Sequence, residues 1–158
     1  VLKVIGLELK KVNENIRDLI LKDERLKALS IIVKSVPGIG EVTSWKLLTV
    51  TNEFKSFKTG RQFACYSGVV PFDHQSGTSI KGKPRVSNMA NKDMKCLLHM
   101  GALSIINGRK GELYDYYIRR VEEGKHKMSV INAIRNKVLS RVFSCVKKME
   151  KYEAYSVG

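Results

Sequence analysis

The stretch VPGIG at residues 36–40 divides two segments in which apolar residues recur every three or four positions. Asp23 precedes the first segment and is suited to cap its helix through the carboxylate. Proline disfavours continuation of that helix, and the two glycines permit a sharp change of chain direction. The sequence therefore predicts two helices joined by a tight turn, at about residues 29–51.

The same turn resembles the helix-hairpin-helix found in many DNA-handling proteins. In such a turn, backbone amides at the start of the second helix can point at a phosphate, aided by the helix dipole. We expect Gly38, Ile39 and Gly40 to contact a DNA phosphate in this way, with Lys46 nearby. Such a contact positions the DNA backbone and reads no sequence. The alternative is a tight helical corner that binds nothing.

Residues 1–22 have the apolar spacing of a coiled coil. The seam alternates steps of three and four through Leu2, Ile5, Leu9, Val12, Ile16 and Leu19. Asp23 falls on the next seam position and ends the pattern. We expect a coiled-coil-like linker helix whose residues 2–19 join copies of the chain into a homo-oligomer. A helix that packs on its own chain is the alternative.

The rest of the chain also follows helical periods, and no strand pattern is convincing. Thr59 and either Asn88 or Asn91 are suited to cap further helices. The last helix is expected to carry its lysines and arginines on the outer face. Its buried side should consist of Met128, Ile131, Ile134, Val138, Val142, Cys145 and Met149. The predicted fold class is all-α, with a helical domain at residues 23–151 and a frayed tail at 152–158.

The chain is strongly basic. Lysine and arginine outnumber aspartate and glutamate by 29 to 15, which gives a formal net charge of +14. Such an excess repels itself unless a polyanion relieves it, so nucleic acid is the first partner to consider. An anionic membrane surface is the alternative, but the charge is not gathered on one amphipathic helix. Because no apolar run reaches membrane-spanning length and no signal peptide is visible, we expect no membrane partner.

The three cysteines, Cys65, Cys96 and Cys145, are far apart and lie in apolar helical patterns. They have neither the CxxC spacing nor the paired histidines of a zinc site. We expect buried thiols in a reducing bacterial or archaeal cytoplasm, and no metal bound by the chain. Because the chain begins at Val1 without a methionine, we also expect it to be part of a longer protein.

Residues 68–85, GVVPFDHQSGTSIKGKPR, form the longest run without a helical or strand period. A long irregular segment in a compact helical domain is typically functional or disordered. This one contains a Ser-Gly pair that begins at Ser76, followed by Lys81, Lys83 and Arg85 at alternate positions. We expect these basic residues, together with Lys92, to contact DNA. A solvated loop surface is the alternative.

An ordered series of motifs extends across this region. The VPGIG turn is followed by FKTGRQ at 57–62, YSGVVP at 66–71, the Ser76 pair, GKPRVS at 82–87 and NK at 91–92. In this order the motifs resemble the C-terminal transposase-20 domain of the IS one-ten family of insertion-sequence transposases. Related site-specific DNA invertases share that domain. The resemblance covers roughly residues 29–147, and the N-terminal helix resembles the family's linker.

The resemblance implies a recombinase in which Ser76 attacks a DNA phosphodiester and holds the broken strand as a phosphoserine. It also implies a separate RuvC-like domain whose acidic residues bind magnesium, and a structured noncoding guide RNA that pairs with the DNA. No acidic cluster of that kind is visible in this sequence. We therefore expect magnesium only in the full-length enzyme, and no recombination by this chain alone. One departure is Ser67, where many relatives have alanine.

Apart from the resemblance, Ser76 reads as an ordinary loop serine that forms a turn with Gly77. A serine hydroxyl needs a base, a metal or strong electrostatic help to act as a nucleophile. Asp73 and His74 are the nearby candidates for a base, and the spacing fixes neither against Ser76. The alternative function is a non-enzymatic helix-hairpin-helix module that binds nucleic acid.

Overall fold

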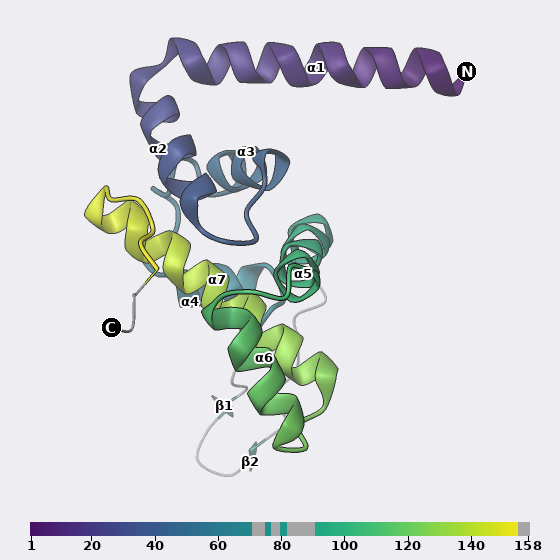
Figure 1. Ribbon diagram of the computed structural model, residues 1–158. Coiled ribbons are helices and arrows are strands. Elements are labelled where there is room, and N and C mark those ends of the chain that lie inside the picture. The colour runs from purple at the N-terminus through teal and green to yellow at the C-terminus, as the bar shows by residue number, and fades with distance from the viewer. Residues whose placement is uncertain (71–74, 77–79, 82–90, 155–158) are drawn as a thin grey trace.

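The computed structural model describes residues 1–70, 75–76, 80–81 and 91–154, and Figure 1 shows their arrangement. The helices are α1 (Leu2–Lys22), α2 (Glu24–Ser35), α3 (Glu41–Val50), α4 (Gly60–Tyr66), α5 (Lys92–Asn107), α6 (Glu112–Glu122) and α7 (Lys127–Lys148). The all-α class predicted from the sequence is confirmed. The described part of the chain also contains two short strands, β1 (Gln75–Ser76) and β2 (Ile80–Lys81), which pair antiparallel. A two-residue strand is too short to give a periodic signal in the sequence.

Helix α7 organises the core and packs against α2, α4, α5 and α6. Its buried side meets apolar residues from each of these helices and from the turn after α2. The core consists of Val33, Val36, Ile39, Leu47, Phe63, Ala64, Val69, Met94, Leu98, Ala102, Leu113, Ile131, Ile134, Val138, Leu139 and Val142. The segments on either side of residues 71–90 are therefore attached to one continuous core.

Several expected burial positions differ in the structure. Met128 lies in the exposed first turn of α7, and Met149 lies at its end in a left-handed conformation with φ 56°. Both are exposed, so the predicted burial of these two methionines is wrong. Cys96 is also exposed, on the outer face of α5. Arg135 shows the opposite difference, because it is buried in α7 although arginines were expected on the outer face of that helix.

Helix starts follow the expected capping residues. Asp23 Oδ1 accepts hydrogen bonds from the backbone amides of Arg25 and Leu26, each at 2.9 Å. Thr59 caps α4 by accepting from the amide of Gln62, and Asn91 caps α5. Each cap satisfies a backbone donor that the helix itself leaves unpaired. The sequence therefore located these helix starts correctly, and it left Asn91 as one of two candidates.

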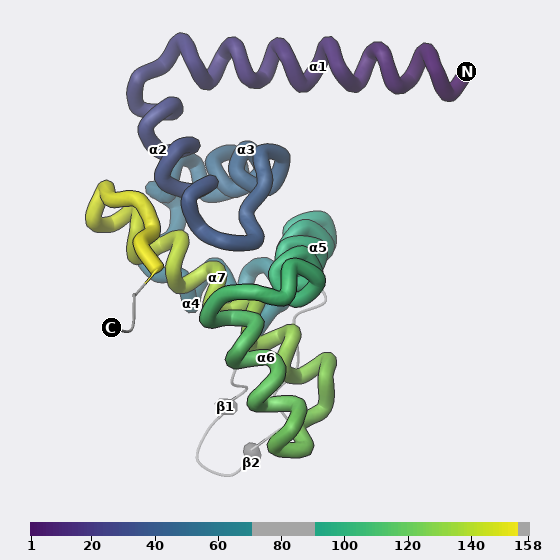
Figure 2. Tube along the Cα trace, in the orientation of Figure 1, coloured from purple at the N-terminus to yellow at the C-terminus, as the bar shows by residue number. Residues whose placement is uncertain are grey.

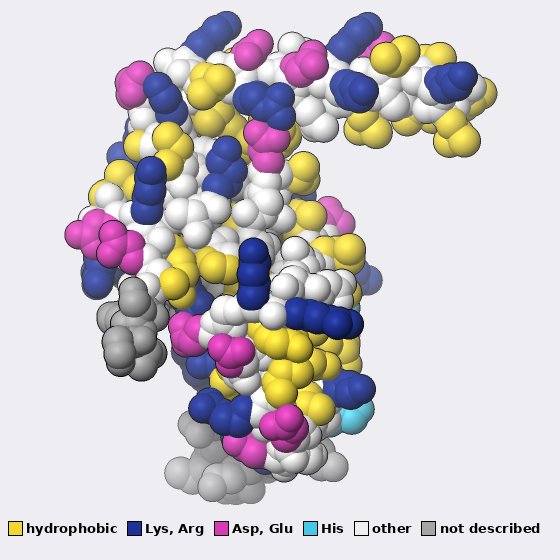
Figure 3. Space-filling view, in the orientation of Figure 1, with side chains coloured by type: hydrophobic (Ala, Val, Ile, Leu, Met, Phe, Trp, Pro, Cys, Tyr) yellow, Lys and Arg dark blue, Asp and Glu magenta, His cyan; other side chains and the backbone are white. Residues whose placement is uncertain are grey.

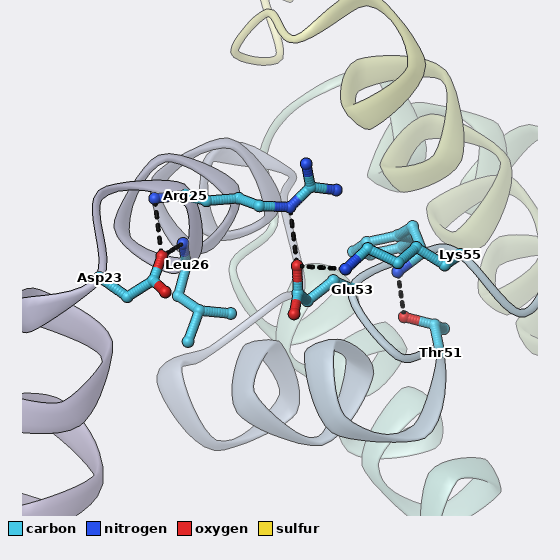
Figure 4. A network of polar contacts seen from close by, with 7 residues as sticks. Asp23, Arg25, Leu26, Thr51, Glu53 and Lys55 are labelled. Carbon is cyan, nitrogen blue, oxygen red and sulfur yellow. Dashed lines mark hydrogen bonds and ion pairs between the residues drawn. The ribbon is translucent and has the colours of Figure 1, made fainter.

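A left-handed turn after α3 holds the next segment in place. Residues 52–54 all have positive φ angles, between 48° and 64°. Thr51 Oγ1 accepts from the amide of Phe54 at 2.9 Å, while Glu53 binds both Arg25 at 2.7 Å and Lys55 at 3.1 Å (Figure 4). Hydrogen bonds from Lys55 and Arg25 lower the pKa of the Glu53 carboxyl. This network connects the start of α2 to the end of α3.

The VPGIG turn packs directly against α5. A Cβ atom on Gly101 would lie 2.2 Å from the carbonyl oxygen of Gly38, and a Cβ on Gly38 would lie 2.8 Å from Ile105 Cδ1. Gly38 also has φ +85°, which side chains rarely tolerate. The two glycines thus allow backbone-to-backbone approach between the turn and α5. This packing alone accounts for glycine at position 38.

Helix α1 projects away from the rest of the protein (Figure 2). Among the described elements its backbone lies close to α2, and side chains near its end also reach α3. The expected seam residues are exposed except Ile16, and Leu2 is 87% exposed. The seam therefore does not pack on the described part of its own chain.

Arg17 ties α1 to α3. Its Nε and Nη2 atoms donate to the two carboxylate oxygens of Glu41 at 3.0 and 2.7 Å. The hydrogen bond from Arg17 lowers the pKa of Glu41 and raises that of Arg17. A two-point contact of this kind fixes orientation as well as distance.

We expect Arg17→Met to lower hydrogen-exchange protection in residues 16–22 at neutral pH, because the tie between α1 and α3 is lost. The folded pKa of Glu41 is lowered, so the tie contributes above the unfolded pKa of that carboxyl and is lost as pH falls through the folded value. Protection in the wild type should therefore approach that of Arg17→Met in acid. Lys10→Met removes a charge elsewhere on α1 and serves as the control; equal effects of both variants would contradict this account.

Candidate nucleic-acid interface

The turn residues predicted to contact phosphate serve different structural purposes. Gly38 packs on α5, and the side chain of Ile39 is buried in the core. Gly40 is the N-cap of α3 and provides no side-chain cap, so the amides of the first turn have no hydrogen-bonding partner from a cap side chain. Lys46 lies one turn further on, where its Nζ is 3.6 Å from Asp93 Oδ2 on α5. The phosphate contact predicted for this turn thus stays a prediction, and Lys46 already has a carboxylate nearby.

The segment that contains Ser76 leaves and rejoins the core at neighbouring points. The amide of Asn91 donates to the carbonyl of Tyr66 at 3.0 Å, and Asn91 Nδ2 donates to the Tyr66 hydroxyl at 3.3 Å. Val69, just before the segment, is buried, and its amide donates to the carbonyl of Ala64 at 2.9 Å. These contacts fix both ends of the segment to α4 and α5.

Ser76 lies in strand β1, where it is paired with Ile80 of β2. Lys81 lies in β2 and is paired with Gln75. The backbone thus brings Ser76 and Lys81 into one short hairpin. Lys92 is exposed at the first position of α5. Four predicted site or base residues, Asp73, His74, Lys83 and Arg85, lie outside the described residues.

Ser67, the second hydroxyl near the motif, is enclosed by the core. It is fully buried, and its Oγ donates to the carbonyl of Ala64 at 3.2 Å. A hydroxyl in this position satisfies a helix carbonyl and cannot reach a DNA strand. Of these two serines, Ser76 is therefore the candidate nucleophile.

The described residues do not form a metal site. Across residues 1–70, 75–76, 80–81 and 91–154, no group of three or more His, Cys, Asp or Glu side chains is placed to hold an ion. The magnesium implied by the family resemblance therefore finds no ligand set in this part of the chain. No helix in the same part is long and apolar enough to cross a membrane.

Charged side chains are scattered over the face of the molecule seen in Figure 3 and do not form a single basic patch on it. Lysine and arginine lie over several helices on this face, with acidic side chains between them.

Arg135 is a buried charged residue that was not predicted from the sequence. Arg135 is 4% exposed, and its Nε is buried with no hydrogen-bond partner. The sequence held a signal for this burial, because position 135 lies four residues after Ile131 and three before Val138, on the apolar side of α7.

The family is decided by a sequence match. A model of the transposase IS116/IS110/IS902 family matches residues 30–118, which include the turn, α4, Ser76 and α5. The chain belongs to this transposase family. The match covers more than half of the chain, and the family resemblance drawn from the ordered motifs is confirmed.

Three relatives are similar to most of this chain. The pilin gene-inverting protein of Moraxella lacunata is 29% identical over 122 residues, which cover 77% of this chain and 38% of that protein. The insertion element IS110 uncharacterized 43.6 kDa protein of Streptomyces coelicolor is 29% identical over 127 residues, which cover 80% of this chain and 31% of that protein. The transposase for insertion sequence element IS1111A of Coxiella burnetii is 25% identical, covering 96% and 43%. The chain thus spans less than half the length of each.

Proposed function

We propose that this chain is the DNA-binding and serine-nucleophile domain of a transposase or site-specific recombinase. Ser76 attacks a DNA phosphodiester: its Oγ–P bond forms while a P–O bond to one sugar oxygen breaks, and the hydroxyl proton passes to the leaving oxygen. The number of phosphoester bonds is unchanged, so the phosphoserine link stores the energy needed to rejoin a strand. The observation that carries the proposal is the family match that spans Ser76.

The described residues at the ends of the segment that contains Ser76 are held together, because Asn91 hydrogen-bonds to Tyr66. The position of a nucleophile matters, because small errors in it greatly reduce the rate of attack. Lys81, in the strand paired with that of Ser76, and Lys92, at the start of α5, would supply positive charge to a bound phosphate. Positive charge favours the build-up of negative charge on phosphate oxygens in the transition state.

The proposal includes further parts that belong to the full-length protein. A RuvC-like domain outside these 158 residues would bind magnesium and assist attack by Ser76. A structured noncoding RNA would select the DNA sites by base pairing. The turn at Gly38–Gly40 would hold the DNA backbone through the amides at the start of α3, which no side chain caps.

The alternative is a non-enzymatic module that binds nucleic acid through the same turn and basic segment. Covalent trapping separates the two functions. A protein–DNA adduct that disappears in the Ser76→Ala variant supports the enzyme, whereas salt-sensitive binding without any adduct supports the module.

We also propose that two copies of the chain associate through α1. Its seam is exposed along residues 2–12, and exposed apolar rows of this kind mark association surfaces. Acidic residues in the seam should therefore separate the copies.

The double variant Leu9→Asp, Val12→Asp is expected to weaken self-association at least about tenfold, because each new carboxylate would have to be buried in the seam. Sedimentation of the purified chain measures this change. Lys10→Asp alters charge beside the seam and should have a smaller effect. A wild-type chain that remains monomeric at high concentration would exclude association through α1.

A further inference from the structure

Arg135 is an arginine enclosed in the core without a counter-ion. The structure gives it no ion pair or hydrogen bond among the described residues, and its Nε is buried and unpaired. Burial lowers the pKa of its guanidinium, which reflects the unfavourable transfer of a cation out of water. Proteins rarely leave such a group unmatched, and each case calls for an explanation.

Other arginines in the described chain show what a matched partner looks like. Arg141, also on α7, has Nη2 2.7 Å from Glu112 Oε2, and its guanidinium lies over the Tyr152 ring at 5.1 Å. Arg17 binds both oxygens of Glu41. Arg135 is more deeply buried than either and has no carboxylate among the described residues. The guanidinium of Arg135 therefore lacks the anionic partner that Arg17 and Arg141 have.

The tip of the Arg135 side chain reaches the surface. Among its nitrogens only Nε is both fully enclosed and unpaired, and neither Nη atom makes a hydrogen bond to the described residues. The small exposed part of the residue therefore includes the Nη end of the guanidinium. This end is the part of the side chain that a ligand could reach, because the residue as a whole is 4% exposed.

A second polar group on the same helix is also unmatched. Asn132 lies one turn before Arg135 on the same side of α7, and its Oδ1 is buried without a hydrogen-bond partner. Arg135 Nε and Asn132 Oδ1 are therefore two unmatched polar atoms on one side of α7.

We propose that Arg135 binds a phosphate group of DNA, whose oxygens supply the partner that the guanidinium lacks in the free chain. Arginine presents a planar fork of donors that matches two phosphate oxygens, and a desolvated guanidinium binds an anion more strongly than an exposed one. A phosphate is favoured over a carboxylate because the chain carries a net charge of +14 and belongs to a transposase family. This proposal rests on the DNA-binding function proposed above.

The test compares Arg135→Met with Arg109→Met in the same 158-residue chain. Methionine keeps much of the apolar volume of the arginine side chain and removes the charge, while Arg109 is an exposed arginine that loses the same charge. Binding to a 20-base-pair DNA duplex is followed by fluorescence anisotropy over a series of salt concentrations. Thermal unfolding is measured in parallel without DNA.

We expect Arg135→Met to weaken binding about tenfold, as for loss of a charged hydrogen bond, and to reduce the slope of log K against log salt by about 0.9. Its Tm should be equal to or above that of the wild type, because an unmatched buried charge is removed. Arg109→Met should change affinity less. Arg135→Lys, which keeps the charge without the fork, should recover only part of the affinity.

Each other outcome overturns the assignment. A lower Tm or an unfolded Arg135→Met chain shows that the guanidinium already has a structural partner. Equal weakening by both methionine variants shows a general charge effect. If Arg135→Met loses affinity for an RNA duplex of the same sequence but not for the DNA duplex, the phosphate that Arg135 binds belongs to RNA. If the wild-type chain does not bind the DNA duplex, both the proposed DNA-binding function and the proposed role of Arg135 are wrong. If the wild type binds and Arg135→Met binds equally well, only the proposed role of Arg135 is wrong.

Discussion

Ser76→Ala in the full-length transposase should reduce DNA strand transfer by at least about a thousandfold, because the variant has no oxygen at the position that attacks the phosphodiester. Binding to DNA should persist, since the basic side chains and the contact between Tyr66 and Asn91 at the ends of the segment are unchanged. The measurements are strand transfer on a DNA substrate and denaturing gel analysis of a covalent protein–DNA adduct. The adduct should be present in the wild type and absent in the variant.

Two control variants distinguish the loss of the nucleophilic hydroxyl from the loss of another hydroxyl in the same region. Ser79→Ala removes a hydroxyl from the same segment, and Ser67→Ala removes the buried hydroxyl that bonds to Ala64. Both should retain the adduct. Strand transfer that is unchanged in Ser76→Ala would exclude this serine as the nucleophile and leave the binding-module function. A loss of DNA binding together with activity would instead assign Ser76 a structural part in holding the hairpin.

Gly101→Ala should destabilise the fold by at least about 2 kcal/mol, in the upper part of the range for overpacked cores. The added Cβ would lie 2.2 Å from the Gly38 carbonyl oxygen, and backbone on both sides of this contact leaves little room for adjustment. Chemical denaturation monitored through Trp45, which is buried in α3, measures the change. Since alanine favours a helix by about 1 kcal/mol over glycine, any net loss reports a larger steric effect.

Gly6→Ala is the matched control for this substitution. Gly6 lies inside α1, and a Cβ there would meet nothing within 4 Å. The same change should therefore leave stability unchanged or raise it. If Gly101→Ala were as stable as Gly6→Ala, the close approach of the VPGIG turn to α5 would not exist in solution.

The features that sequence predicted correctly depend on local interactions. Asp23 and Thr59 were identified as helix caps because an N-cap side chain bonds to amides only two or three residues ahead. The all-α class followed from apolar spacing within single helices. Ser76 was singled out through an ordered series of motifs, and the family match over residues 30–118 covers the same region. Its chemical role remains a prediction, as do the phosphate contacts of Gly38, Ile39, Gly40 and Lys46 and the DNA contacts of the basic residues.

The features that sequence missed depend on contacts between distant segments. The approach of Gly38 to Gly101 joins positions 63 residues apart, and the local sequence at the turn does not indicate which distant segment packs on it. His126 caps α7 by accepting from the amide of Met128 at 3.3 Å, although histidine is not a preferred cap. Arg135 was placed on the outer face by its charge, yet its position in the helical period follows the apolar side. For His126 and Arg135, the usual behaviour of the residue type suggested a different position from the one that the fold gives it.

The joint between α1 and α2 has a mechanical consequence. A single residue, Asp23, connects the two helices in an extended conformation with φ −104° and ψ 115°. Since α1 has 21 residues, it is a rod about 32 Å long. A rotation of about 10° at this joint would move the free end of that rod by roughly 5 Å. The hydrogen-bonded pair of Arg17 and Glu41 lies in the part of α1 near Asp23. A small change in this contact would therefore produce a larger displacement at the free end of α1. This ion pair and the packing of α1 on α2 together determine the direction in which the exposed seam of α1 points.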